Sequence, residues 1–314
     1  MKKKFTYTLF FICSLLMMLT PSCSSDNSEE TPEIIEIGNF GKIQFDRERF
    51  GLGQTVTASC QLPSTSGNIS DLTYTWYLDN EKLVQNTISN GVSSVTFTLP
   101  SPSSYITTGD YNIELKASTN NTEVKLPAPA TATINVQYPD AYLSFWGDNV
   151  DLTQKNVPGL TGSNNEYTVT MQDYLQAKEN KENMQCTYYF TDNKLSKVDE
   201  IHTIASDRTD INMMQFFLST FKGMITKTLS YYNFTTTQSF ISFANQTQKD
   251  FNLNSQNSDY NKDDFEIDIF VLGGTITIHA ENDNTELVIN AVGKTAENLN
   301  DYTINCTYTY TPKQ

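Results

Sequence analysis

The sequence has few of the residues from which catalytic and metal-binding sites are usually built. Only two histidines occur, His202 and His279, and neither lies in a Gly-x-Ser-x-Gly or His-Glu-x-x-His motif. The five cysteines include no Cys-x-x-Cys pair, which disfavours a zinc or thioredoxin-like redox site. No recognisable motif for triad hydrolysis or zinc chemistry is therefore present.

Basic residues are also scarce, with 21 Lys and Arg against 36 Asp and Glu and a formal net charge of −15. Binding to phosphate requires clustered Lys and Arg, so this balance excludes nucleic acid as the expected partner. It also disfavours docking on anionic lipid. After Leu19 the sequence has no apolar run long enough to span a bilayer, and we expect no transmembrane helix there.

The N-terminal segment is the one long apolar stretch. Lys2, Lys3 and Lys4 precede a largely apolar run from Phe5 to Leu19, which is shorter than the roughly 20 residues that a membrane span needs. We therefore predict a cleavable signal peptide over residues 1–22.

The end of this signal resembles the lipobox of bacterial lipoproteins. Its sequence is Leu19-Thr20-Pro21-Ser22-Cys23, in which Thr20 stands where the motif usually has Leu. The resemblance implies that Cys23 carries lipid and becomes the N-terminus; the alternative is an ordinary secretory signal with an incidental cysteine.

A polar, acidic stretch follows, and residues 23–32 are predicted to be a flexible tether because they offer no apolar surface to bury. An acidic run directly after a lipidated cysteine resembles the surface-export signal of Bacteroidota lipoproteins. That implies the outer membrane and its cell-surface face. Loss of three lysines with the signal leaves 18 basic against 36 acidic residues, a net charge of −18.

Residues 33–139 show period-two alternation in short runs divided by turn residues, which predicts a β-sandwich. The clearest run has Tyr74, Trp76 and Leu78 on one face. The expected strands lie at 41–45, 55–62, 72–78, 95–99, 111–115 and 132–138.

Two details of this region resemble an immunoglobulin-like fold, including the PKD-like domains of bacterial surface proteins. Trp76 follows Cys60 by sixteen residues, and Gly109-Asp110-Tyr111 resembles the entry to a later strand. An antibody-type domain would have its second cysteine where this chain has Ile113, so we expect Cys60 to be a buried thiol. The resemblance implies a fold and a spacer role rather than an activity.

Residues 140–314 predict an α+β domain with an antiparallel sheet and one main helix. Apolar residues recur at helical spacing from Asp210 to Leu229, and Asp192-Asn193 is typical of a hairpin turn. The expected strands lie at 167–171, 184–190, 194–201, 239–244, 265–272, 275–280, 286–292 and 302–310.

Cys186 and Cys306 occur in similar strands, each within a Cys-Thr-Tyr sequence at the same phase of alternation. In an export compartment they would form a disulfide if the two strands were neighbours. The alternative is two buried thiols in similar surroundings.

Four polar residues and one tryptophan are the candidates for a site. If the segment 265–272 were a strand beside 275–280, Glu266 and Asp268 would share a polar face with His279 and could do acid–base chemistry. The alternative is the ordinary solvated side of a sheet. Trp146, near the junction of the two domains, is a candidate ligand-binding residue or a residue packed between domains. His202 has no recognised catalytic context.

Asp259, Asn261 and Asp263 have the Asp-x-Asn-x-Asp spacing that opens many calcium loops. An EF-hand would need glycine at the sixth position and an acid at the twelfth, where this chain has Asp264 and Phe270. A looser calcium site or a plain polar loop are the two remaining interpretations.

The sequence thus predicts a lipid-anchored, non-catalytic surface protein that binds a glycan or a protein, with the sandwich as spacer. An accessory subunit of an outer-membrane complex is the first alternative. A carbohydrate-active enzyme with unrecognised carboxylates is the second, since such pairs have no local signature.

Overall fold

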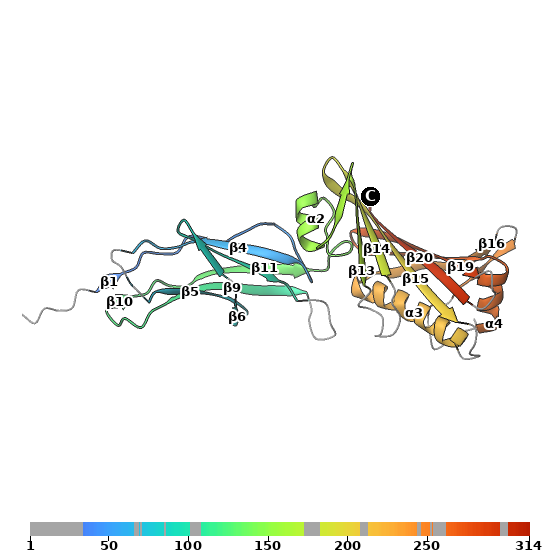
Figure 1. The fold of residues 1–314 in the computed structure, drawn as a ribbon, viewed down its shortest axis with the longest axis horizontal. Coiled ribbons are helices and arrows are strands. Elements are labelled where there is room, and N and C mark those ends of the chain that lie inside the picture. Colours follow the sequence, from blue (N-terminus) through green and yellow to red (C-terminus); the bar gives the residue numbers. More distant parts are fainter. Residues whose placement is uncertain are drawn as a thin grey trace, which may run out of the picture.

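The computed structural model describes residues 34–65, 69, 71–84, 86–100, 108–172, 183–207, 213–243, 246–251, 253, 262–295 and 301–314. Their secondary structure is mainly β, with several antiparallel sheets and one long helix (Figure 1), which confirms the predicted fold class. The expected signal peptide, Cys23 and the acidic tether lie outside these residues.

The N-terminal part is a two-sheet sandwich. One sheet has the order β2 (Gln44–Phe45), β4 (Thr55–Gln61), β8 (Val92–Thr98) and β7 (Asn86–Ser89). The other has the order β3 (Phe50–Gly51), β11 (Ala130–Gln137), β9 (Gly109–Ser118), β5 (Thr73–Leu78) and β6 (Glu81–Leu83). A short parallel pair of β1 (Ile35–Glu36) and β10 (Val124–Lys125) lies at one end.

The sandwich core contains the residues that the alternation pattern placed inward. Trp76 is fully buried, and its indole Nε1 donates to the Ser93 hydroxyl at 2.9 Å, so its one polar atom is satisfied. Ile113 is fully buried on β9, and Cys60 is a buried thiol that donates to the Gly41 carbonyl at 3.3 Å. The cluster of buried side chains runs from Phe50 to Val136.

The C-terminal part, here called the head, has a nine-stranded sheet in which neighbouring strands are antiparallel. Its order is β12 (Thr161–Ser163), β13 (Glu166–Gln172), β14 (Asn183–Thr191), β15 (Lys194–Asp207), β20 (Asp301–Pro312), β19 (Thr285–Thr295), β18 (Thr275–Glu281), β16 (Thr235–Phe243) and β17 (Gln246–Asp250).

Helix α3 (Met213–Tyr231) covers one face of this sheet (Figure 1). Its buried side chains Leu218, Phe221 and Ile225 recur at three- and four-residue spacing, which is why this segment prefers a helix with one apolar side. On β20, alternate residues from Tyr302 to Tyr310 face the helix side and are buried, whereas Asn305 on the other face is exposed. The sheet therefore has one face in the core and one face toward solvent.

The two-residue hairpin between β14 and β15 is confirmed. Asp192 and Asn193 have φ values of 52° and 59°, the left-handed conformation that a type I′ turn requires and that Asp and Asn tolerate.

The prediction of a strand at 265–272 is wrong. The structure has α4 (Lys262–Phe265) followed by a π-helix, η2 (Glu266–Val271). Phe265 and Ile269 are buried one turn apart, so the apolar residues serve a helical period rather than an alternating one. The helix packs closely on the sheet: a Cβ added at Gly293 would lie 2.2 Å from Ile269 Cγ2.

Sandwich and head lie end to end, and the molecule is elongated (Figure 1). β1 lies at the end of the sandwich away from the head, while α4 lies at the end of the head away from the sandwich.

Candidate functional site

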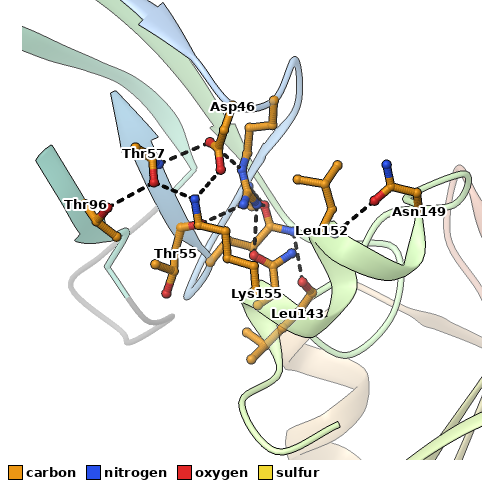
Figure 2. A network of polar contacts seen from close by, with 12 residues as sticks. Asp46, Thr55, Thr57, Thr96, Leu143, Asn149, Leu152 and Lys155 are labelled. Carbon is orange, nitrogen blue, oxygen red and sulfur yellow. Dashed lines mark hydrogen bonds and ion pairs between the residues drawn. The ribbon is translucent and has the colours of Figure 1, made fainter. Parts of the chain in front are cut away.

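The junction between sandwich and head is a network of polar contacts centred on Arg47, whose side chain is buried. Within the sandwich, its guanidinium donates to Gln54 Oε1 at 3.1 Å and to the Thr55 carbonyl at 2.6 Å. Across the junction it donates to Asn156 Oδ1 at 2.9 Å, at the end of α2 (Val150–Asn156). One buried cation therefore holds backbone and side chains of both parts (Figure 2).

A second cation from the head completes this network. Lys155 of α2 donates to the Asp46 carboxylate and to the Thr57 hydroxyl of the sandwich, as Figure 2 shows. Burial by itself raises the pKa of Asp46, but hydrogen bonds from Lys155 and the Thr57 N–H, together with Arg47, lower it below its ordinary value. Asp46 therefore stabilises the junction above pH 3.8, and that contribution is lost as the pH falls through the folded-state pKa.

The chain segment between the two parts is held by Asp140, which is buried. Arg49 NH1 lies 3.1 Å from its carboxylate, and the guanidinium of Arg49 stacks over the Phe145 ring at 4.0 Å. From the head, Asn284 donates to the same carboxylate at 3.0 Å. Because these groups come from the sandwich, the connecting segment and the head, the two parts are fixed relative to one another.

Trp146 lies at this junction and is half-buried. Its indole Nε1 donates to the Thr285 hydroxyl at 2.9 Å, and its backbone N–H donates to the Asp140 carboxylate at 3.0 Å. Its ring packs against the core of the head. These contacts match the packing interpretation of Trp146 more closely than the ligand-binding one.

Asp148 is the junction residue whose replacement we expect to increase stability. Burial, the largest cause, raises its pKa above the ordinary value, against the opposing effects of the Phe145 N–H, Arg47 and Arg49. Because the folded-state pKa lies above the unfolded one, the ionised carboxylate costs stability at neutral pH, and this cost disappears as the pH falls through the folded-state pKa.

The Phe145 N–H donates to Asp148 Oδ2 at 3.0 Å, and Asp148→Asn keeps an oxygen that can accept this hydrogen bond. We expect a higher free energy of unfolding at pH 7 and a smaller increase in that free energy on acidification. Urea unfolding of both proteins at several pH values between 7 and 3.8, the ordinary pKa of the group, measures this. A variant that is less stable at pH 7 and has the unchanged pH dependence would contradict the assignment.

A second polar cluster lies in the core of the head, on the side of β15 that faces α3. Glu200 and His202 are 3% and 4% exposed, and His202 Nε2 lies 3.4 Å from Glu200 Oε2. The Tyr310 hydroxyl donates to the same oxygen at 3.3 Å, and the His202 ring packs edge-on against Tyr308. The other oxygen, Glu200 Oε1, is buried and has no hydrogen-bond partner among the described residues.

Tyrosines surround this carboxyl group. Burial, followed by the negative charge of Glu200, raises the pKa of Tyr231 to about 12, and the same two causes raise the pKa of Tyr232 and Tyr310 well above 10. Their hydroxyls therefore stay protonated, and that of Tyr310 donates to Glu200 Oε2. Glu200 was not among the residues predicted from the sequence, although an acid and a histidine two residues apart on one strand share a face.

Cys186 and Cys306 flank this cluster. They are two buried thiols rather than a disulfide. Cys186 lies opposite Glu200 and Cys306 opposite His202, so the central strand β15 separates them. Two strand spacings amount to about 9.5 Å, well beyond the Cα separation of a disulfide.

The proposed acid–base group of His279, Glu266 and Asp268 is not assembled. His279 lies on the solvent face of β18 and stacks on Phe240, with ring centroids 6.1 Å apart. Asp268 is buried and paired with Lys249 at 2.8 Å, and Glu266 accepts the Tyr302 hydroxyl at 2.6 Å. Because 265–272 is helical, both acids serve to attach η2 to the sheet.

Of the candidate calcium ligands, Asp259 and Asn261 lie outside the described residues, and Asp263 belongs to α4. Within the described part of the chain, no group of three or more His, Cys, Asp or Glu residues is placed to hold a metal ion. None of the described helices is both long and apolar enough to cross a membrane.

The end of the head away from the sandwich has exposed apolar side chains. Ile267 and Val271 of η2 are 48% and 69% exposed, and Leu272, which directly follows η2, is 47% exposed. We call these three residues the distal ridge. In a mainly polar, acidic protein, a group of exposed aliphatic side chains on one element is typical of an interaction surface.

Comparison with models of known protein families gives no match, and comparison with curated protein sequences gives none either.

Proposed function

We propose that this protein is a lipid-anchored, non-catalytic binding protein of the outer cell surface. In this account Cys23 carries the anchor, residues 24–32 form the tether, the sandwich is a rigid spacer, and the head carries the binding surface. A protein ligand is favoured over a glycan because the clearest exposed feature of the head is aliphatic. The accessory subunit of an outer-membrane complex is a special case of this role.

The observation that carries the proposal is the junction. A spacer is useful only if it determines where the head stands, and the buried Arg47 network immobilises the head on the sandwich. Figure 1 also supports this role, because β1 and α4, the helix directly before η2, lie at opposite ends of the molecule. An anchor before β1 places the sandwich and the head between the attachment point and the ridge.

The location is tested on the native protein. Mass spectrometry of the N-terminal peptide is expected to show acylated Cys23, and added protease is expected to degrade the head in intact cells. Cys23→Ser should abolish the acyl mass and release the protein from the membrane fraction. An unmodified Cys23, or cleavage at another residue, would remove the anchor from the proposal.

The nature of the ligand is tested separately with the full-length chain on a glycan array. Specific glycan binding would show that the ligand is carbohydrate and would contradict the preference for protein. Turnover of a polysaccharide would contradict the non-catalytic role altogether.

A further inference from the structure

We propose that the distal ridge is the docking surface of the head and that its occupant is a cationic amphipathic helix of a partner protein. This inference rests on the proposed binding role, whose ligand class and position it specifies. The ridge is exposed, it is rigidly attached to the sheet, and it belongs to an acidic protein.

The ridge is held in place by polar contacts on its buried side. Asp268 is 3% exposed and makes two contacts with Lys249 of the edge strand β17, at 2.8 and 3.0 Å. Glu266 accepts the Tyr302 hydroxyl of β20 at 2.6 Å. These contacts attach two separate strands to η2, so the element is fixed while its outer side stays exposed.

The backbone adds to this attachment. The Leu272 N–H donates to the Ile267 carbonyl at 2.8 Å, which brings the two ends of the ridge to the same side of the π-helix. The Gly274 N–H donates to the Asp268 carbonyl at 2.8 Å, and a Cβ at Gly274 would lie 2.6 Å from that oxygen. The ridge is therefore preorganised, and binding would lose little conformational entropy.

The shape of the ridge favours a helical partner. Two aliphatic side chains of the short helix η2, together with Leu272 directly after it, form a narrow apolar stripe, which can pack against the apolar stripe of a second helix. The area is small, so the expected contact is weak or transient unless other surfaces add to it.

The charge favours a basic partner. The whole chain has a net charge of −15. Asp264, one turn before the ridge, is exposed. The same charge disfavours a second copy of this chain and an anionic membrane. A helix with leucines on one side and lysines on the other complements both the apolar stripe and its acidic surroundings.

The probe is a fluorescent helical peptide of leucine and lysine, titrated against the full-length chain and followed by anisotropy. We expect binding that weakens at least about tenfold in the double variant Val271→Asp/Leu272→Asp, because two aliphatic contacts are lost. The matched control is the double variant Val84→Asp/Ile88→Asp, which adds the same two charges at residues of the sandwich that are 88% and 56% exposed and should leave affinity nearly unchanged. A peptide with serine in place of leucine tests binding by charge alone.

Equal affinity for the wild type and the double variant would overturn the proposal, as would equal binding of the serine peptide or no binding at all. Sedimentation of the protein alone tests for a second copy: a dimer that the double variant abolishes would also overturn it. So would co-sedimentation with phosphatidylcholine vesicles that depends on the same two residues. These assays are done in solution, so their failure is distinguishable from failure of the lipid anchor.

Discussion

Replacing His202 by alanine is expected to lower the free energy of unfolding by about 3–5 kcal/mol. The substitution removes the nitrogen that lies 3.4 Å from Glu200 Oε2, while the carboxyl group stays buried under α3. Of the described residues, only Tyr310 would then be within hydrogen-bond distance of that oxygen. A buried charge that loses its partner costs more than the pair contributed, which is why this single change has a large effect.

A double-mutant cycle separates this cost from simple loss of packing. In a Glu200→Gln background the buried group is neutral, and His202→Ala should cost clearly less than in the wild type. His279→Ala is the matched control, because this histidine is half-exposed on the solvent face and should cost less than about 1 kcal/mol. Additive effects of the two core substitutions in urea unfolding would show that Glu200 and His202 do not interact.

Arg47→Ala is expected to lower stability by about 2–4 kcal/mol, since hydrogen bonds to charged groups contribute about 1.5–3 kcal/mol each and this cation makes several. The variant leaves Asn156 and the Thr55 carbonyl without their charged donor. It should also loosen the head from the sandwich. We therefore expect calorimetry to resolve two unfolding transitions, one for the sandwich and one for the head.

The control for this prediction is Lys125→Ala. Lys125 pairs with Glu36 at 2.9 Å, but both side chains are 70% exposed, and the expected effect is below about 1 kcal/mol. Equal losses of stability in Arg47→Ala and Lys125→Ala would show that burial of Arg47 has no special role. A single, unchanged transition in Arg47→Ala would show that the junction does not couple the two parts.

Much of the fold could be predicted because its signals are local. Alternation with a period of two located Trp76 and Leu115 in the sandwich core and Cys306 and Tyr308 in the core of the head. The helical period of α3 and the hairpin at Asp192 were equally visible, because each depends on side chains or backbone preferences within one turn or one strand.

Other elements could not be predicted because tertiary contacts decide them. Residues 265–272 alternate well enough to suggest a strand, yet close packing on Gly293 and the Asp268–Lys249 pair make them helical. Helix α2 is too short to show a period, and its one local signal is Asn149, whose side chain accepts the Leu152 N–H at 2.9 Å.

The junction was beyond sequence reasoning for a different reason. Arg47 and Asn156 are separated by 109 positions, and nothing in either neighbourhood marks them as partners. The exposure of the distal ridge is also set by tertiary packing. An Ile or a Val in a helix is buried or exposed according to which face of the helix packs on the rest of the protein.

The central claim is that the sandwich holds the head in one orientation. Spin labels at Ile88→Cys on the sandwich and Lys294→Cys on the head test it by pulsed electron spin resonance, because both positions are exposed while Cys60, Cys186 and Cys306 are buried. We expect one narrow distance distribution, which broadens in Arg47→Ala. A broad distribution in the protein with Arg47 intact would contradict the rigid spacer.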